Sequence, residues 1–224
     1  KATLCGAGCD EITTYSFIAS KALDSLALDE KDERRAAIKL LNPLGDEYST
    51  LRTQLATGML TVLATNYNRK NSDVRLFEVS KRFIPKALPL SEQPLELPCL
   101  SIGAYGKDED FYTMKGLVEQ VLDIFGVTYS FERSSEPYLH PGRQAKAVID
   151  GKEVDTFGEV HPTTASGYGI EDRAFIAEVK LDILYNFNKE TVIYKPLPKF
   201  PAVFRDFALL CDIDLPVGDM EKAI

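Results

Sequence analysis

The chain has 224 residues, of which 45% are hydrophobic, so it can bury one full core, or one core plus a piece of a second domain. Its net charge of -8 and its pI near 4.9 disfavour a mainly electrostatic hold on nucleic acid, although a local basic patch stays possible. No apolar run approaches the roughly 18 residues of a membrane span, and no signal-like segment opens the chain. We therefore expect a soluble, cytoplasmic protein without a membrane partner.

The N-terminal part of the chain predicts short elements joined by turns. Gly6 and Gly8 can end a helix, and a run of β-branched and aromatic residues favours a strand. A serine is a good helix cap, and an Asn-Pro pair favours a turn. The expected elements are a helix end at residues 1–8, a strand at 12–17, a short helix at 20–27 capped by Ser20, a charged and solvated run at 29–35, and an extended apolar piece at 38–41.

Residues 51–86 show the clearest change of hydrophobic period. Leu55, Met59, Val62 and Leu63 have the spacing of one helical face. The apolar residues at 74–79 follow a different period, with charges between them. We interpret the stretch as an amphipathic helix, a loop at 71–73, a strand, a tight turn and a second strand.

Prolines and one well-patterned helix dominate the middle of the chain. Four prolines in residues 84–98 argue against a continuous helix or an interior strand, so we expect a long surface connection there. A strand is expected at 100–105. The next helix should begin after Asp110 and end at Gly126, because its apolar residues share one side.

The segments that follow predict a sheet of hairpins. The dipeptide Asp150-Gly151 favours a type I′ turn between strands at 144–149 and 152–159. Further strands are expected at 129–132 and 174–179, and short helices at 162–168 and 181–185. Strands linked mostly by hairpins, with few helices, predict an α+β domain in which an antiparallel sheet is flanked by helices.

A proline-rich spacer near the C-terminus predicts a domain boundary. Pro196, Pro198 and Pro201 lie in residues 194–204, where they favour a stiff linker. A strand at 207–211 and a helix that begins at Asp219 are too little to fold alone. We expect one domain at residues 1–193, and at 194–224 a linker with the truncated start of a second domain.

Side chains capable of chemistry do not form a known catalytic pattern. Cys5 and Cys9 lack a second pair and a nearby histidine, so we expect all four cysteines to be free, buried or partly buried thiols. His140 and His161 each precede a proline; they are conceivable as an acid–base pair, but turn histidines bonded to nearby backbone are favoured. The sequence has no nucleophile elbow and no phosphate-binding glycine loop.

Several phrases occur in a specific order along nearly the whole chain. They are EITTYSF at 11–17, NPL at 42–44, LRT at 51–53, DVRLFEV at 73–79, LHPGR at 139–143, GEVHP at 158–162 and KFPAVFRD at 199–206. Together they resemble the C-terminal half of the β subunit of bacterial-type phenylalanyl-tRNA synthetase. The resemblance implies a catalytic-like domain with the class II synthetase fold, followed by the start of a ferredoxin-like anticodon-binding domain.

The resemblance also implies which class II motifs have been lost. The motif 2 run F-R-x-E, whose arginine holds the α-phosphate of ATP, is represented by residues 83–86, with Ile84 in the arginine position and Lys86 in the glutamate position. Isoleucine cannot donate to a phosphate. In the motif 3 region at 174–181, Lys180 is at best a point-charge substitute for the nucleotide-binding arginine. Motif 1, which builds subunit interfaces, is retained from Gly8 to Tyr15, with Tyr15 in place of the usual proline.

The function implied by the resemblance is a non-catalytic segment that packs against the catalytic α subunit of an (αβ)₂ enzyme. That enzyme attaches phenylalanine to tRNA(Phe) with ATP and magnesium, whereas this segment is expected to hold no cofactor and no metal. Its expected interface residues are Thr13, Thr14, Tyr15 and Ser16. The alternatives are a free-standing class II-like paralogue that binds or activates a small amino acid, and a direct tRNA-binding module, which the acidic composition disfavours.

Overall fold

The structure is a computed structural model that describes residues 1–187, 194, 196–213 and 215–224. Contacts divide the chain into two units, Lys1–Thr191 and Val192–Ile224. The predicted boundary between residues 193 and 194 borders on residues outside the described part, and the identity of the second unit stays a prediction. No helix in the described ranges is long and apolar enough to cross a membrane.

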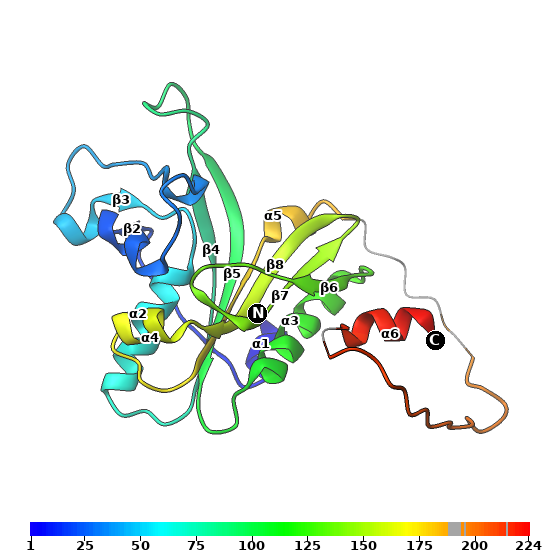
Figure 1. Ribbon diagram of the computed structural model, residues 1–224. Helices are drawn as coiled ribbons and strands as arrows, with labels where there is room; N and C mark the ends of the chain where they lie inside the picture. The colour runs from blue at the N-terminus through cyan, green and yellow to red at the C-terminus, as the bar shows by residue number, and fades with distance from the viewer. Residues whose placement is uncertain (188–193, 195, 214) are drawn as a thin grey trace. The chain divides into compact units, whose positions relative to one another are not determined.

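A seven-stranded sheet with the order β1-β4-β5-β9-β8-β7-β6 forms the centre of the first unit (Figure 1). Neighbouring strands are antiparallel except β1 and β4, which are parallel. The predicted α+β class with an antiparallel sheet is therefore confirmed. The strands are β1 (Asp10–Glu11), β4 (Val74–Ile84), β5 (Leu95–Tyr105), β6 (Ser130–Arg133), β7 (Leu139–Ile149), β8 (Lys152–Val160) and β9 (Ala174–Val179), with β2 (Phe17–Ile18) and β3 (Thr50–Leu51) as a separate pair.

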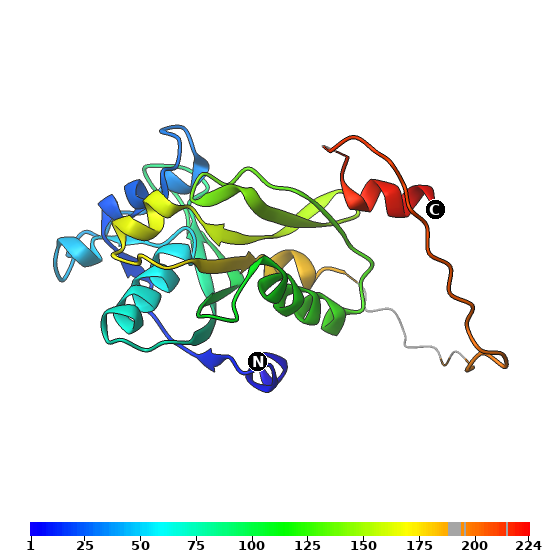
Figure 2. The same ribbon diagram turned by 60° about the horizontal axis from the view of Figure 1, so that its bottom comes forward.

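The two faces of the sheet bury two apolar clusters. Alternation along β9 shows how this arises, because Phe175 and Ala177 belong to one cluster while Ala174 and Ile176 belong to the other. Helices α1 (Ala2–Gly6), α3 (Phe111–Phe125) and α5 (Leu181–Leu184) contribute to the first cluster. Helices α2 (Ala56–Asn68) and α4 (Pro162–Gly167) contribute to the second. Figure 2 shows α2 in cyan and α4 in yellow at the left, with α3 in green and α5 in orange to their right.

Helix α3 and the β7–β8 hairpin follow the sequence prediction closely. Asp110 caps α3 by accepting a hydrogen bond from the Thr113 amide at 2.7 Å, and Gly126 ends the helix with a φ of 61°. Asp150 and Gly151, with φ values of 49° and 74°, make the tight turn between β7 and β8. Both predictions are confirmed because their signals are local: a cap, a stop and a turn dipeptide.

The predicted strand at residues 12–17 is wrong. Only its flanks are paired, as β1 and β2, and residues 12–15 lie in no strand. The Thr14 amide donates to the Glu78 carboxylate at 3.0 Å, so a side chain takes the place of a neighbouring strand. The predicted serine cap is also wrong, because the 3-10 helix Ser20–Leu26 has Ala19 in the cap position and the Ser20 hydroxyl faces Ser49 at 3.4 Å.

The predicted turn and second strand within residues 51–86 are wrong, because β4 continues without interruption to Ile84. The surface connection is accordingly shorter than expected and covers residues 85–94, since β5 begins at Leu95. Pro98 lies inside β5, opposite Lys81 of β4. Proline has no backbone N–H to donate, but no hydrogen bond to β9 is lost at Pro98, because β9 pairs with β5 only from Leu100 onward.

Three smaller expectations need correction. The charged run at 29–35 is not wholly solvated, because the Arg34 side chain is only 26% exposed and pairs with Asp32. Cys9 and Cys99 are buried free thiols as expected, whereas Cys5 and Cys211 are exposed. The predicted strand at 207–211 is wrong, because these residues lie in no strand and are exposed. Helix α6 (Val217–Ala223) includes the expected Asp219 and begins before it.

Candidate subunit interface

A buried ion pair lies beneath the segment that was expected to form an interface. The guanidinium of Arg52 lies 3.2 Å from the carboxylate of Glu78, and each side chain is only 1% exposed. Arg52 also donates from Nε to the Lys81 carbonyl at 3.0 Å and from Nη2 to the Ser80 hydroxyl. These extra bonds matter, because a buried ion pair stabilises a fold only when its remaining donors and acceptors are also satisfied.

Thr14 completes this network and thereby fixes the path of residues 13–16. Its amide donates to Glu78 Oε1 at 3.0 Å and its hydroxyl to Glu78 Oε2 at 2.8 Å, while the hydroxyl accepts from Arg52 Nη1 at 2.8 Å. The Arg52 amide in turn donates to the Ser16 carbonyl at 2.9 Å. The segment therefore has a defined conformation without belonging to a strand.

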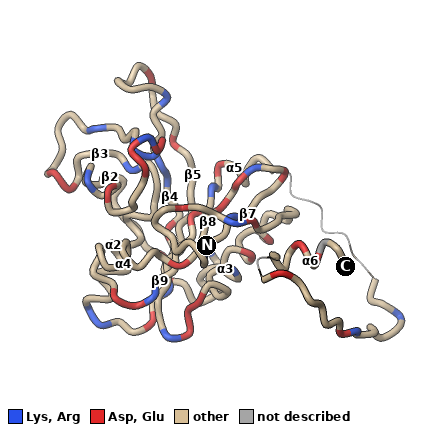
Figure 3. Tube along the Cα trace, in the orientation of Figure 1, with Lys and Arg blue, Asp and Glu red and all other residues tan. Residues whose placement is uncertain are grey.

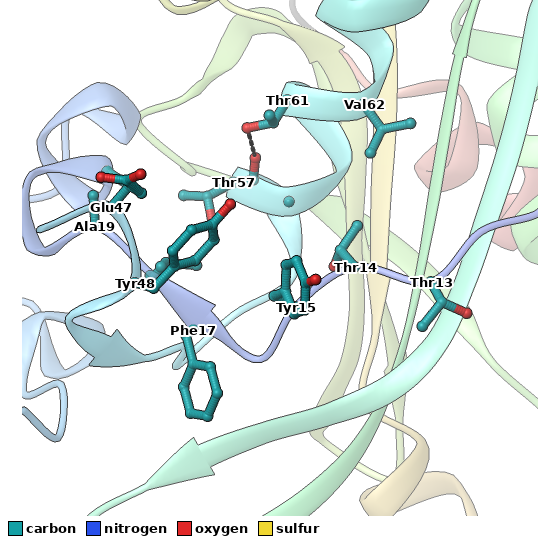
Figure 4. A pocket seen from close by; sticks show the side chains of 13 residues that line it. Thr13, Thr14, Tyr15, Phe17, Ala19, Glu47, Tyr48, Thr57, Thr61 and Val62 are labelled. Carbon is teal, nitrogen blue, oxygen red and sulfur yellow. Dashed lines mark hydrogen bonds between the residues drawn. The ribbon is translucent and has the colours of Figure 1, made fainter. Parts of the chain in front are cut away.

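The same segment forms one wall of a pocket of about 740 Å³. Figure 4 shows Tyr15 and Tyr48 beside each other, with Thr61 and Val62 on α2 above them. The two tyrosine rings meet edge to face at 5.4 Å between centroids. The lining residues are Thr13, Thr14, Tyr15, Phe17, Ile18, Ala19, Ala22, Glu47, Tyr48, Thr57, Gly58, Thr61 and Val62.

The chemistry of the pocket suits an apolar side chain from another chain. Glu47 is the one charged side chain among the described residues that line it. Tyr15 is 71% exposed, which is high for a large aromatic residue, and such residues are enriched at protein–protein contacts. Gly58 brings α2 close to the segment, since a Cβ there would lie 3.0 Å from the Thr14 hydroxyl oxygen.

The four consecutive residues of the expected interface lie along this network and pocket, and their role at an interface stays a prediction. Sequence reasoning missed the two residues that hold them, Arg52 and Glu78. Thr13, Thr14 and Tyr15 line the pocket, and Ser16 bonds through its carbonyl to Arg52. The only sequence signal for the ion pair is a glutamate among the apolar residues of β4. A charge in a buried strand needs a partner, but the sequence does not reveal that Arg52 is that partner.

The residues in the degraded motif 2 and motif 3 positions lie elsewhere. Ile84 is the last residue of β4, and Lys86 in the following loop pairs with Glu92 at 2.6 Å. Lys180 follows β9 and donates to Glu153 at 2.7 Å. Two side chains that could have met an anion are thus already engaged by carboxylates of the same chain.

A second, polar cleft of about 440 Å³ lies where β4, β8 and β9 meet the loop at residues 31–34. Lys180 lines it, whereas Ile84 and Lys86 do not. Arg34 also lines it and pairs with two other lining residues, Asp32 and Glu136, at 2.7 Å each. Within the described ranges, no group of three or more His, Cys, Asp or Glu side chains could hold a metal ion.

Both histidines are bonded to nearby backbone, as the sequence favoured, but the expected turn positions are wrong: His140 is the second residue of β7, and His161 caps α4. His140 Nδ1 accepts from the Gly142 amide at 3.1 Å, and His161 Nδ1 accepts from the Thr163 amide at 3.2 Å. Their rings stack at 6.5 Å between centroids. Arg143 binds Glu159 through two nitrogens, at 2.7 and 2.8 Å.

Comparison with known proteins identifies relatives over almost the whole chain. The family model for the phenylalanyl tRNA synthetase beta chain CLM domain matches residues 1–181. Among the similar proteins are the phenylalanine–tRNA ligase β subunits of Clostridium acetobutylicum, 39% identical over 223 residues, and of Clostridium tetani, 38% identical over 223 residues. A β subunit from Staphylococcus aureus is 33% identical over 233 residues. The chain spans 28% of the length of each of these relatives.

Solved structures with a similar fold include two of pyrrolysyl-tRNA synthetase from Desulfitobacterium hafniense. Each aligns with a TM-score of 0.65 over 82% of this chain and 64% of the other, at 15% and 16% identity. At this identity the likeness concerns the fold alone, and it confirms the expected class II synthetase-like architecture. The family model decides the family: over residues 1–181 the chain belongs to the phenylalanyl tRNA synthetase beta chain CLM domain family.

Proposed function

We propose that this chain is a non-catalytic segment of a phenylalanine–tRNA ligase β subunit and supports assembly with the catalytic α subunit. The observation that carries the proposal is the pocket beside Tyr15, held in place by the buried pair of Arg52 and Glu78. In this proposal the α subunit places an apolar side chain in the pocket and packs against Thr13, Thr14, Tyr15 and Ser16. All three β-subunit relatives favour this function over a free-standing paralogue.

The non-catalytic part of the proposal rests on the motif 2 and motif 3 positions. An apolar Ile84 cannot bind the α-phosphate of ATP, and Lys86 is paired with Glu92. ATP and Mg²⁺ therefore belong to the whole enzyme, an (αβ)₂ complex in the cytoplasm that charges tRNA(Phe), and this segment contributes no ligand to them. Residues 194–224 begin the anticodon-binding-like domain.

Direct tRNA binding by this segment has less support. Figure 3 shows basic and acidic residues alternating along the trace of the described chain, without a long stretch of one sign. With a net charge of -8, the chain would repel an extended polyanion. Contacts of the enzyme with tRNA(Phe) are accordingly assigned to other parts of the complex.

Co-purification of the full β polypeptide with α tests the interface. Tyr15→Asp introduces a charge at the mouth of the pocket, and we expect it to weaken α–β association at least tenfold, in the range of an interface hot spot. The matched control is Tyr112→Asp on α3, because Tyr112 is 74% exposed and Tyr15 is 71% exposed. Equal association of the two variants, measured by analytical ultracentrifugation, would remove the interface assignment.

A further inference from the structure

The motifs LHPGR and GEVHP converge on one corner of the sheet that the proposed function does not use. The first residue of β7, Leu139, pairs with the last residue of β8, Val160. This pairing places His140 beside His161 at one end of the hairpin. Arg173, which immediately precedes β9, completes a set of four donor side chains that we call the histidine–arginine corner: His140, Arg143, His161 and Arg173.

Both imidazoles present a donor rather than an acceptor to the surroundings. Each Nδ1 accepts a backbone amide, from Gly142 and from Thr163, so the proton of each neutral ring sits on Nε2. Within the described part of the chain, neither Nε2 has a hydrogen-bond partner. The histidine pair therefore offers two N–H groups that can donate to an acceptor from another molecule.

The two arginines share one nearly buried carboxylate. Glu159, with its side chain 4% exposed, accepts from Arg143 at 2.7 Å and from Arg173 at 2.6 Å. The hydrogen bonds use Nε and Nη2 of each guanidinium, and Nη1 has no partner among the described residues. Two guanidiniums facing one carboxylate leave one positive charge uncompensated, while the Arg143 and Arg173 side chains are 42% and 56% exposed.

The histidine pair and Glu159, which binds the two arginines, lie at the same end of the β7–β8 hairpin. Glu159 is in β8 and His161 follows the last residue of that strand, so about 6.6 Å of chain separates them.

We propose that the histidine–arginine corner docks a carboxylate side chain from an acidic segment of a partner protein. With Glu159 already bound to both guanidiniums, a carboxylate from the partner would balance the second positive charge. The imidazole N–H groups supply further donors. A nucleic acid fits less well, because the corner offers a single net positive charge on a chain of net charge -8. This surface is separate from the Tyr15 pocket, so the inference does not depend on the proposed function.

The test uses the whole 224-residue chain and a hexaglutamate peptide as probe, titrated at low salt. We expect the largest NMR shifts at the Nη1–H groups of Arg143 and Arg173, which Glu159 leaves free, and at the histidine Nε2–H groups. Arg173→Gln should weaken binding about tenfold or more, which corresponds to the loss of a hydrogen bond to a charged group. Lys152→Gln is the matched control, because it removes the same charge at the opposite end of the same hairpin and should leave binding unchanged.

Arg143→Lys tests the geometry, because it keeps the charge but loses the two-nitrogen fork, and an intermediate affinity is expected. Circular dichroism melts establish that each variant is folded. The NMR shifts of the unsubstituted chain locate the binding site even if a variant fails to fold. The inference is overturned if shifts fall outside the corner, or if Arg173→Gln and Lys152→Gln bind equally. It is also overturned if inorganic phosphate binds as tightly as the peptide, or if a hexanucleotide RNA binds more tightly.

Discussion

Arg52 and Glu78 form an ion pair at 3.2 Å in which both side chains are 99% removed from solvent, and Thr14 is hydrogen-bonded to both. The pair joins β4 to the segment ahead of α2 and to the wall of the Tyr15 pocket. A charged pair in such a place specifies one path for residues 13–16. Loss of the pair should therefore reduce the stability of the chain and disturb the proposed interface.

Replacing Glu78 by alanine should destabilise the chain by about 3–5 kcal/mol, because the Arg52 charge would be left buried without compensation. Urea unfolding followed by circular dichroism measures this directly. The control is Glu96→Ala, which breaks the pair of Lys81 and Glu96 on the same β4–β5 hairpin. Those side chains are 54% and 53% exposed, so the expected loss is about 1 kcal/mol or less. Similar losses of unfolding free energy in the two variants would show that the buried Arg52–Glu78 pair contributes no more to stability than an exposed pair.

Local signals in the sequence determined which predictions were right. The cap at Asp110, the stop at Gly126 and the turn at Asp150-Gly151 each act over a few residues, so α3 and the β7–β8 hairpin were predictable. The path of Thr14 was not, because its amide is satisfied by Glu78, which lies 64 residues away in the sequence. The same limit applies to Pro98: a proline is acceptable at this position of β5 only because the pairing with β9 starts at Leu100.

The candidate site was selected only through resemblance, and its role stays a prediction. Residues 13–16 were selected because they follow a motif 1-like glycine, and the structure adds the ion pair and the pocket. Composition and spacing alone gave no reason to select Arg52 or Tyr48. Buried pairs and pockets form between distant segments, so they depend on the tertiary packing that local patterns do not specify.

Asp155 should make stability fall with rising pH. Both of its carboxylate oxygens are buried without a hydrogen-bond partner among the described residues, and burial, opposed in part by Lys180, raises the pKa of Asp155 well above its ordinary 3.8. Because the folded-state pKa exceeds the unfolded one, the favourable contribution is complete below pH 3.8 and is lost as pH rises through the raised value.

Asp155→Asn removes this ionisation while keeping the size of the side chain. We expect the variant to gain on the order of 1–3 kcal/mol over the unsubstituted chain at pH 7, and progressively less toward pH 4. Urea unfolding at several pH values measures the difference. A constant difference across that range would mean that the Asp155 carboxylate does not titrate as the burial implies.

Two glycine-to-alanine changes should have opposite effects. At Gly158, a Cβ would lie 2.4 Å from the Arg143 carbonyl oxygen and 2.7 Å from the Gln144 Cα, so β7 and β8 would have to separate. Gly158→Ala should cost about 1–3 kcal/mol or more, as overpacking against backbone does. Gly116→Ala in α3 meets nothing within 4 Å and should gain about 1 kcal/mol from helix propensity. Thermal melts of the two variants decide this, and a Gly158→Ala chain as stable as the parent would contradict the close strand approach.

The β polypeptide without α should neither bind ATP appreciably nor form an aminoacyl adenylate. Ile84 offers no donor to a phosphate, while Lys86 and Lys180 are engaged with Glu92 and Glu153 at 2.6 and 2.7 Å. Phenylalanine-dependent exchange of labelled pyrophosphate into ATP measures adenylate formation, with the α–β complex as positive control. Lys180→Ala separates true activity from contamination, because only activity belonging to this chain can respond to it. Exchange by purified β that disappears in Lys180→Ala would establish a working nucleotide site here and refute the non-catalytic assignment.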